Sequence, residues 1–150
     1  MKPDTVGLPD SLGGEVIRVT DTDGDRATWT FAADPSAVRA ARGAVREQLH
    51  RWELGGVADL AELLVSELVT NALRHATGPV GVRLTRPEGR TGVLLLEVSD
   101  PVPEPPQQRV ARPDDEGGRG LQLLAHSCRR WGHRSGSHGK TVWCELAVPR

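Results

Sequence analysis

The chain has 150 residues, of which 37% are hydrophobic and 26% are charged, and its formal net charge is −1 at pH 7. This length and composition are typical of one soluble domain with its own core, and the near-neutral charge gives no electrostatic reason to expect nucleic acid or an anionic membrane as a partner. No apolar run approaches the roughly 20 residues of a membrane span, and residues 1–15 lack the apolar core of a signal peptide, so we expect a cytoplasmic protein.

The two cysteines are Cys128 and Cys144. Two thiols at this spacing match neither a disulfide framework nor a zinc-binding pattern. We therefore expect both to be small residues of the core.

The first 25 residues are rich in Gly, Asp, Thr and Pro without sustained periodicity, which predicts a flexible arm with a short strand near 15–20. Residues 26–150 are then expected to form a single domain. Alternating apolar and polar residues predict a strand over 27–32. Apolar residues at helical spacing, after an Asp-Pro pair that is typical of a helix start, predict a helix over 35–52.

The next helix is expected over 57–76, and one of its faces changes character along its length. An α-helix turns about 100° per residue, so Leu60, Leu64, Glu67 and Asn71 lie within an arc of roughly 60°. A buried carboxylate and a buried amide need polar partners. Either this arc is an ordinary solvated face with a Glu–Asn pair one turn apart, or the second half of the helix forms the floor of a polar pocket.

The second half of the chain predicts three strands and one helix. Strands are expected over 80–86 and 92–99. The proline-rich segment 100–118 is longer than most loops of compact domains, which is typical of a lid or a binding loop. A helix over 119–131 and a last strand over 140–148 follow. This order of elements predicts an α+β two-layer sandwich, in which a mixed or antiparallel sheet carries helices on one face.

Glycines Gly117, Gly118 and Gly120 occur where the last helix is expected to start. Glycine allows a ligand to approach the backbone closely, and a helix N-terminus offers N–H groups that favour phosphate. The sequence Gly139-Lys140-Thr141 is not a P-loop, because it lacks the earlier glycine of that motif and a strand follows it rather than a helix.

Four features follow one another along the chain: Glu67-x-x-x-Asn71 on a helix, Asp100 after an apolar strand, Gly118-x-Gly120 at a helix start, and Gly139-Lys140-Thr141 entering a strand. In this order they resemble the GHKL family of ATP-binding domains, which includes histidine kinases, gyrase-type topoisomerases and bacterial anti-sigma-factor serine/threonine kinases. The resemblance covers about residues 27–148. The short chain and its ending, from "GGRGLQLLAHSCRRWGHR" to "GKTVWCEL", are most similar to the anti-sigma-factor kinases.

The resemblance implies a role for each of these residues in binding ATP and Mg²⁺. Asn71 would hold Mg²⁺ through its amide oxygen, and Glu67 would accept the proton from the attacking hydroxyl or water. Asp100 would accept a hydrogen bond from the adenine amino group, and Thr141 would support the same edge. The residues implied to contact the phosphates are Gly118, Arg119, Gly120 and Leu121.

Two functions remain open at this point. The first is a kinase that phosphorylates a small antagonist (anti-anti-sigma) protein and sequesters a sigma factor. The second is a catalytically weak or inactive module that holds a partner, with ATP as a structural or regulatory ligand. Glu67 and Asn71 favour the first, whereas Asp100-Pro101-Val102-Pro103-Glu104, which replaces the Asp-x-Gly-x-Gly of the family, favours the second. Kinases of this branch are often dimers, so a homodimer also remains open.

Overall fold

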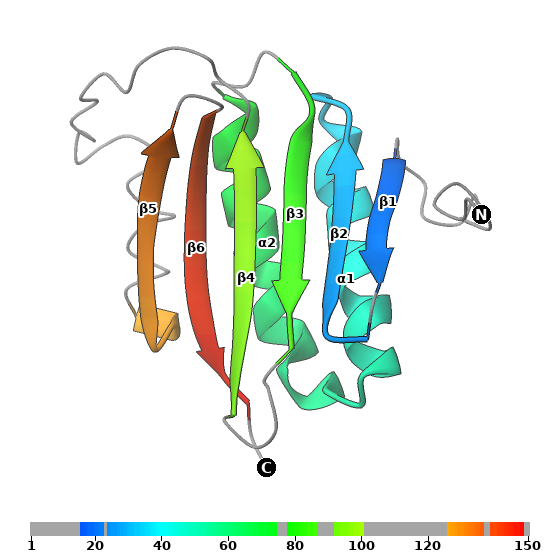
Figure 1. The fold of residues 1–150 in the computed structure, drawn as a ribbon, viewed down its shortest axis with the longest axis vertical. Helices are drawn as coiled ribbons and strands as arrows, with labels where there is room; N and C mark the ends of the chain where they lie inside the picture. Colours follow the sequence, from blue (N-terminus) through cyan, green and yellow to red (C-terminus); the bar gives the residue numbers. More distant parts are fainter. Residues whose placement is uncertain are drawn as a thin grey trace.

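Two helices pack side by side on one face of an antiparallel β-sheet (Figure 1). The computed structural model describes residues 16–22, 24–74, 78–86, 92–100, 126–136 and 139–148. The strands are β1 (Val16–Thr22, backbone alone), β2 (Arg26–Phe31), β3 (Val80–Thr85), β4 (Val93–Asp100), β5 (Arg130–Gly136) and β6 (Gly139–Ala147), and the helices are α1 (Ser36–Arg51) and α2 (Ala58–Leu73). The sheet order is β1-β2-β3-β4-β6-β5. The predicted α+β sandwich is confirmed.

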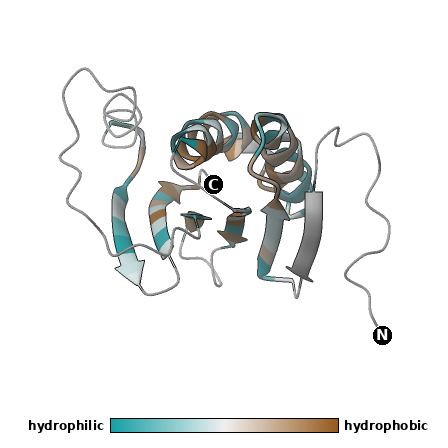
Figure 2. Cartoon of the chain, turned by 90° about the horizontal axis from the view of Figure 1, so that it is seen from above, coloured by the Kyte–Doolittle hydropathy of each residue, from teal (hydrophilic) through white to brown (hydrophobic). Residues whose placement is uncertain are grey.

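The core lies between the sheet and the two helices, which Figure 2 shows together on one side of the strands. Successive side chains of a strand point to opposite faces, so each central strand contributes every second residue to this layer. The inward residues of β2, β3 and β4 are Ala27, Trp29, Phe31, Val80, Val82, Leu84, Leu94, Leu96 and Val98, and all of them are buried. Helix α1 meets them with four alanines, Ala37, Ala40, Ala41 and Ala44. Such small side chains let a helix lie close to the sheet.

Strand β1 pairs with β2, so the strand predicted near 15–20 is present and belongs to the sheet. The boundary predicted between residues 25 and 26 therefore falls inside this β-hairpin. Helices α1 and α2 correspond to the predicted helices with slightly shorter bounds. In the described part of the chain, neither helix has the length and apolar character needed to cross a membrane.

The helix predicted through Trp131 is wrong at its end. Only His126 and Ser127 are helical among the described residues there, and Arg130–Gly136 forms the edge strand β5, paired with β6. This strand lies at the edge of the sheet, where none of its residues is buried, so its sequence lacks the apolar alternation that would have predicted it. Its pairing also depends on Gly132, because a Cβ atom there would come within 2.8 Å of the Trp143 ring.

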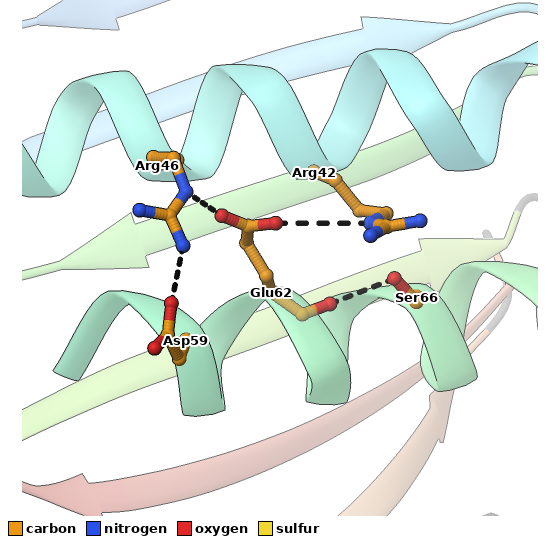
Figure 3. A network of polar contacts seen from close by, with 5 residues as sticks. All are labelled: Arg42, Arg46, Asp59, Glu62 and Ser66. Carbon is orange, nitrogen blue, oxygen red and sulfur yellow. Dashed lines mark hydrogen bonds and ion pairs between the residues drawn. The ribbon is translucent and has the colours of Figure 1, made fainter.

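A network of charged side chains joins α1 to α2 on their outer surface (Figure 3). Arg46 of α1 donates to both Glu62 and Asp59 of α2, and the Nε atom of Arg42 lies 3.8 Å from the other Glu62 oxygen. The Glu62 side chain is only 16% exposed, which places it between the helices. The network therefore marks the flank of α2 that faces α1, and so also the flank that points away from it.

Candidate functional site

Glu67 and Asn71 lie on the flank of α2 that points away from α1. Glu62 marks the opposite flank, because it contacts two arginines of α1. An α-helix turns about 100° per residue, so Glu67 and Asn71 are rotated from Glu62 by roughly 140° and 180°. Both side chains are half-buried. The flank of α2 that points away from α1 lies on the side of β6 and β5 (Figure 1). This flank therefore combines a carboxylate and an amide next to the sheet.

Asp100 is the last residue of β4, and it is 3% exposed. It continues the inward row of Leu96 and Val98, which face the helices. Since α2 packs against β4, Asp100 lies on the same face of the sheet as Glu67 and Asn71. A buried carboxylate at the end of an apolar row can accept hydrogen bonds from a ligand that enters at this end of the sheet.

Thr141 faces the other side of the sheet. The strand register aligns it with Ser99, and the two hydroxyl oxygens lie 2.8 Å apart in a hydrogen bond. Asp100 is aligned instead with Lys140. Because side chains alternate along a strand, the residue of β6 beside Asp100 is Lys140, and Thr141 lies on the opposite face from it. The sequence did not give this register, and the predicted roles of Asp100 and Thr141 at the adenine edge stay predictions.

The predicted phosphate-contacting residues Gly118, Arg119, Gly120 and Leu121 lie outside the described residues. No group of three or more His, Cys, Asp or Glu side chains that could hold a metal ion occurs in the described ranges. Mg²⁺ does not require such a cage, since it usually keeps several waters and binds one or two protein oxygens together with the phosphates of a nucleotide. The half-buried amide of Asn71 can supply an oxygen of this kind.

The two cysteines form a contact that sequence reasoning did not predict. Cys144 is fully buried in the core, as expected, while Cys128 is half-buried and packs against that core. A hydrogen bond from the Cys144 thiol lowers the pKa of Cys128, although partial burial opposes this shift. The same hydrogen bond, together with burial, raises the pKa of Cys144. Cys128 is therefore the thiol that ionises first.

Comparison with known families gives a match over most of this fold. The sequence model of the histidine kinase-like ATPase domain matches residues 31–145, from the end of β2 into β6. The matched region includes Glu67, Asn71, Asp100 and Thr141. No curated protein matches the chain. The chain belongs to the family of histidine kinase-like ATPase domains, and it is therefore an ATP-binding domain.

Proposed function

We propose that this protein is an anti-sigma-factor serine/threonine kinase that uses Mg·ATP to phosphorylate a small antagonist protein and that sequesters a sigma factor in the cytoplasm. One observation carries the proposal. Glu67 and Asn71 are half-buried one turn apart on the flank of α2 away from α1, on the same face of the sheet as buried Asp100. Family membership supports ATP as the ligand, and the resemblance to anti-sigma-factor kinases suggests the protein partners.

Each of these side chains suits one task in phosphoryl transfer. Bound Mg·ATP supplies the phosphoryl group. Asp100 would accept the adenine amino hydrogen bond, and Asn71 would hold Mg²⁺ through its amide oxygen. Glu67 would take the proton of the serine or threonine hydroxyl as its oxygen attacks, acting as a general base. The products are the phosphorylated hydroxyl group and ADP, with the proton on Glu67.

A second function has one observation in its favour. Pro101 and Pro103 follow Asp100 where the family has a glycine-containing motif. Proline fixes its own φ angle and restricts the residue before it, so this segment has less conformational freedom than the glycine version. A module that binds ATP and a partner without transferring phosphate is the alternative.

The two functions differ in what happens when Glu67 is replaced by Gln. The variant keeps the size and hydrogen-bonding shape of the side chain but cannot accept the proton. As a kinase, Glu67→Gln should bind Mg·ATP nearly as well as wild type yet lose about 10²–10⁴-fold in transfer rate. Transfer is measured with labelled ATP and candidate antagonist proteins of the same genome, and ATP affinity is measured by calorimetry.

The matched control is Glu47→Gln, the same change at an exposed position of α1, which should transfer phosphate at the wild-type rate. Equal transfer by Glu67→Gln and wild type would remove Glu67 as the base. A wild-type protein that binds Mg·ATP but transfers no phosphate to any antagonist would instead establish the binding module.

A further inference from the structure

The face of the sheet away from the helices has a hollow at one end of its strands. Successive rows of side chains run across this face, because the strands are in register. One row contains only short side chains over β2, β3, β4 and β6: Thr30, Gly81, Ser99 and Thr141. The next row contains the long side chains Arg83, Glu97 and Trp143. The residues of the short row line an open pocket of about 560 Å³, and the rest of its lining comes from Pro79 and from residues at the ends of β4, β5 and β6.

Cations and hydroxyl groups surround this hollow. Arg134 of β5 and Lys140 of β6 are among the residues that line it, together with Asp100 at the end of β4. Thr30, Ser99 and Thr141 present hydroxyls, which can donate to an acidic ligand. The Nη2 atom of Arg134 is bound to Glu97, but a guanidinium carries five N–H donors, and the Arg134 side chain is 58% exposed. Such donors are suited to carboxylate groups.

Over β2 to β6 this sheet face is basic, although the chain carries a net charge of −1. Side chains alternate along each strand, so the strand pairing shows which charged residues of β2 to β6 lie on this face. The basic residues are Arg26, Arg83, Arg130 and Arg134, and the acidic residues are Glu97 and Glu145. Glu97 is 6% exposed and lies between Arg83 and Arg134, so its charge is largely covered. Arg130 lies over the Trp143 ring, 6.0 Å from its centre. The surface offered to a partner is therefore positive.

We propose that this basic sheet face binds an acidic segment of a partner protein, with one carboxylate side chain of that segment entering the hollow over Gly81. An open hollow on a broad face suits a polypeptide segment better than an enclosed small molecule. Charge complementarity favours an acidic partner over a second copy of this chain, whose own face would be equally basic. Most of this face is opposite to the one with Glu67 and Asn71, and the inference uses neither residue, although Asp100 and Lys140 also line the hollow at the ends of β4 and β6.

Gly81 provides a test that does not depend on charge. A Cβ atom at Gly81 would lie 3.8 Å from the Ser99 Cβ and 3.9 Å from the Trp29 carbonyl oxygen, which are ordinary contacts. Valine should therefore be accepted in β3, where β-branched residues are favoured, while its side chain fills the hollow. Gly81→Val is expected to keep or raise the free energy of unfolding and to weaken binding of the acidic segment.

Binding is measured by calorimetry at low salt on the full chain, with a short synthetic Asp/Glu peptide as the probe and a Lys peptide of equal length as its control. Arg26→Gln and Arg134→Gln should each weaken binding of the acidic peptide about threefold, as expected for partly exposed charges. Arg39→Gln makes the same charge change at an exposed position of α1 and should leave the affinity unchanged. Added salt should weaken the wild-type complex.

Four results would overturn the inference. The first is that Arg39→Gln weakens binding as much as the sheet variants, which would show a response to net charge alone. The second is unchanged affinity in Gly81→Val, Arg26→Gln and Arg134→Gln. The third is tighter binding of a single-stranded oligonucleotide that the same variants weaken. The fourth is self-association in sedimentation equilibrium that Gly81→Val abolishes, because the face would then bind a second copy of this chain.

Discussion

The residues of the candidate ATP site differ in how far the sequence could place them. Helical spacing was enough to align Glu67 and Asn71, because the angle per residue is nearly constant within a helix. Their direction relative to the rest of the molecule was not available from spacing, since it depends on the contact between Glu62 and α1. The side chains of Glu67 and Asn71 are half-buried at the flank of α2. The floor of a pocket requires such partial burial, whereas a fully solvated face would leave both side chains exposed.

Asn71→Ala tests the metal at the residue scale. The substitution deletes the only oxygen that the side chain can offer to Mg²⁺, while alanine retains good helix propensity in α2. ATP binding is therefore expected to lose most of its dependence on Mg²⁺, and the ATP affinity measured in EDTA should be close to that of wild type. The measurement is calorimetric titration with ATP, with and without Mg²⁺. If Mg²⁺ strengthens binding equally in both proteins, Asn71 is not the ligand.

The elements were easier to predict from sequence where one face of each is apolar and the other polar. Helices α1 and α2 and the central strands have such faces, so their periodicity gave them nearly correct bounds. Strand β5 was missed because its residues are half-buried or exposed and include Gly132 and Gly136. The register between β4 and β6 was also out of reach, since it is set by pairing between distant segments. That register decides which face Thr141 occupies.

The arginine–carboxylate network between α1 and α2 gives a prediction at the element scale. Glu62→Ala removes the acceptor shared by Arg42 and Arg46, in a site where the carboxylate is only 16% exposed. We expect the free energy of unfolding to fall by about 1 kcal/mol, near the upper end of values for such pairs. Glu47→Ala removes an exposed pair with Arg51 within α1 and should cost less than about 0.5 kcal/mol.

Urea denaturation of both variants measures the two values, and the comparison is matched because each replaces Glu by Ala inside a helix. A loss for Glu62→Ala no larger than that for Glu47→Ala would mean that the network does not hold the helices together. ATP affinity gives a second reading. A network that orients α2 should affect ATP binding when Glu62 is lost, while Glu47→Ala should leave it unchanged.

At the scale of the whole molecule, the single sheet separates two chemically different sides. The helix side holds the core and the carboxylate and amide groups of the candidate ATP site. The other side carries, over β2 to β6, the arginines of the basic sheet face and the short residues that line the hollow. Core residues such as Val98 and exposed residues such as Ser99 alternate along the same strand, so any opening of the helix–sheet interface disturbs both sides together. A probe placed inside that interface would report on this opening.

Cys144 is such a probe, and its alkylation is the last prediction. Alkylation needs a thiolate and access to it; Cys144 is fully buried and its pKa is raised, whereas Cys128 is half-buried and its pKa is lowered. In the folded protein iodoacetamide should modify Cys128 first, with Cys144 slower by about 10³-fold or more because it reacts only after the molecule opens. Mass spectrometry of the digested protein measures both rates.

The Cys128→Ser variant isolates the buried thiol. In this variant, modification of Cys144 should appear in urea with the same midpoint as the loss of circular dichroism. Rapid modification of Cys144 without urea would show that the sheet and helices separate at a free energy far below that of global unfolding.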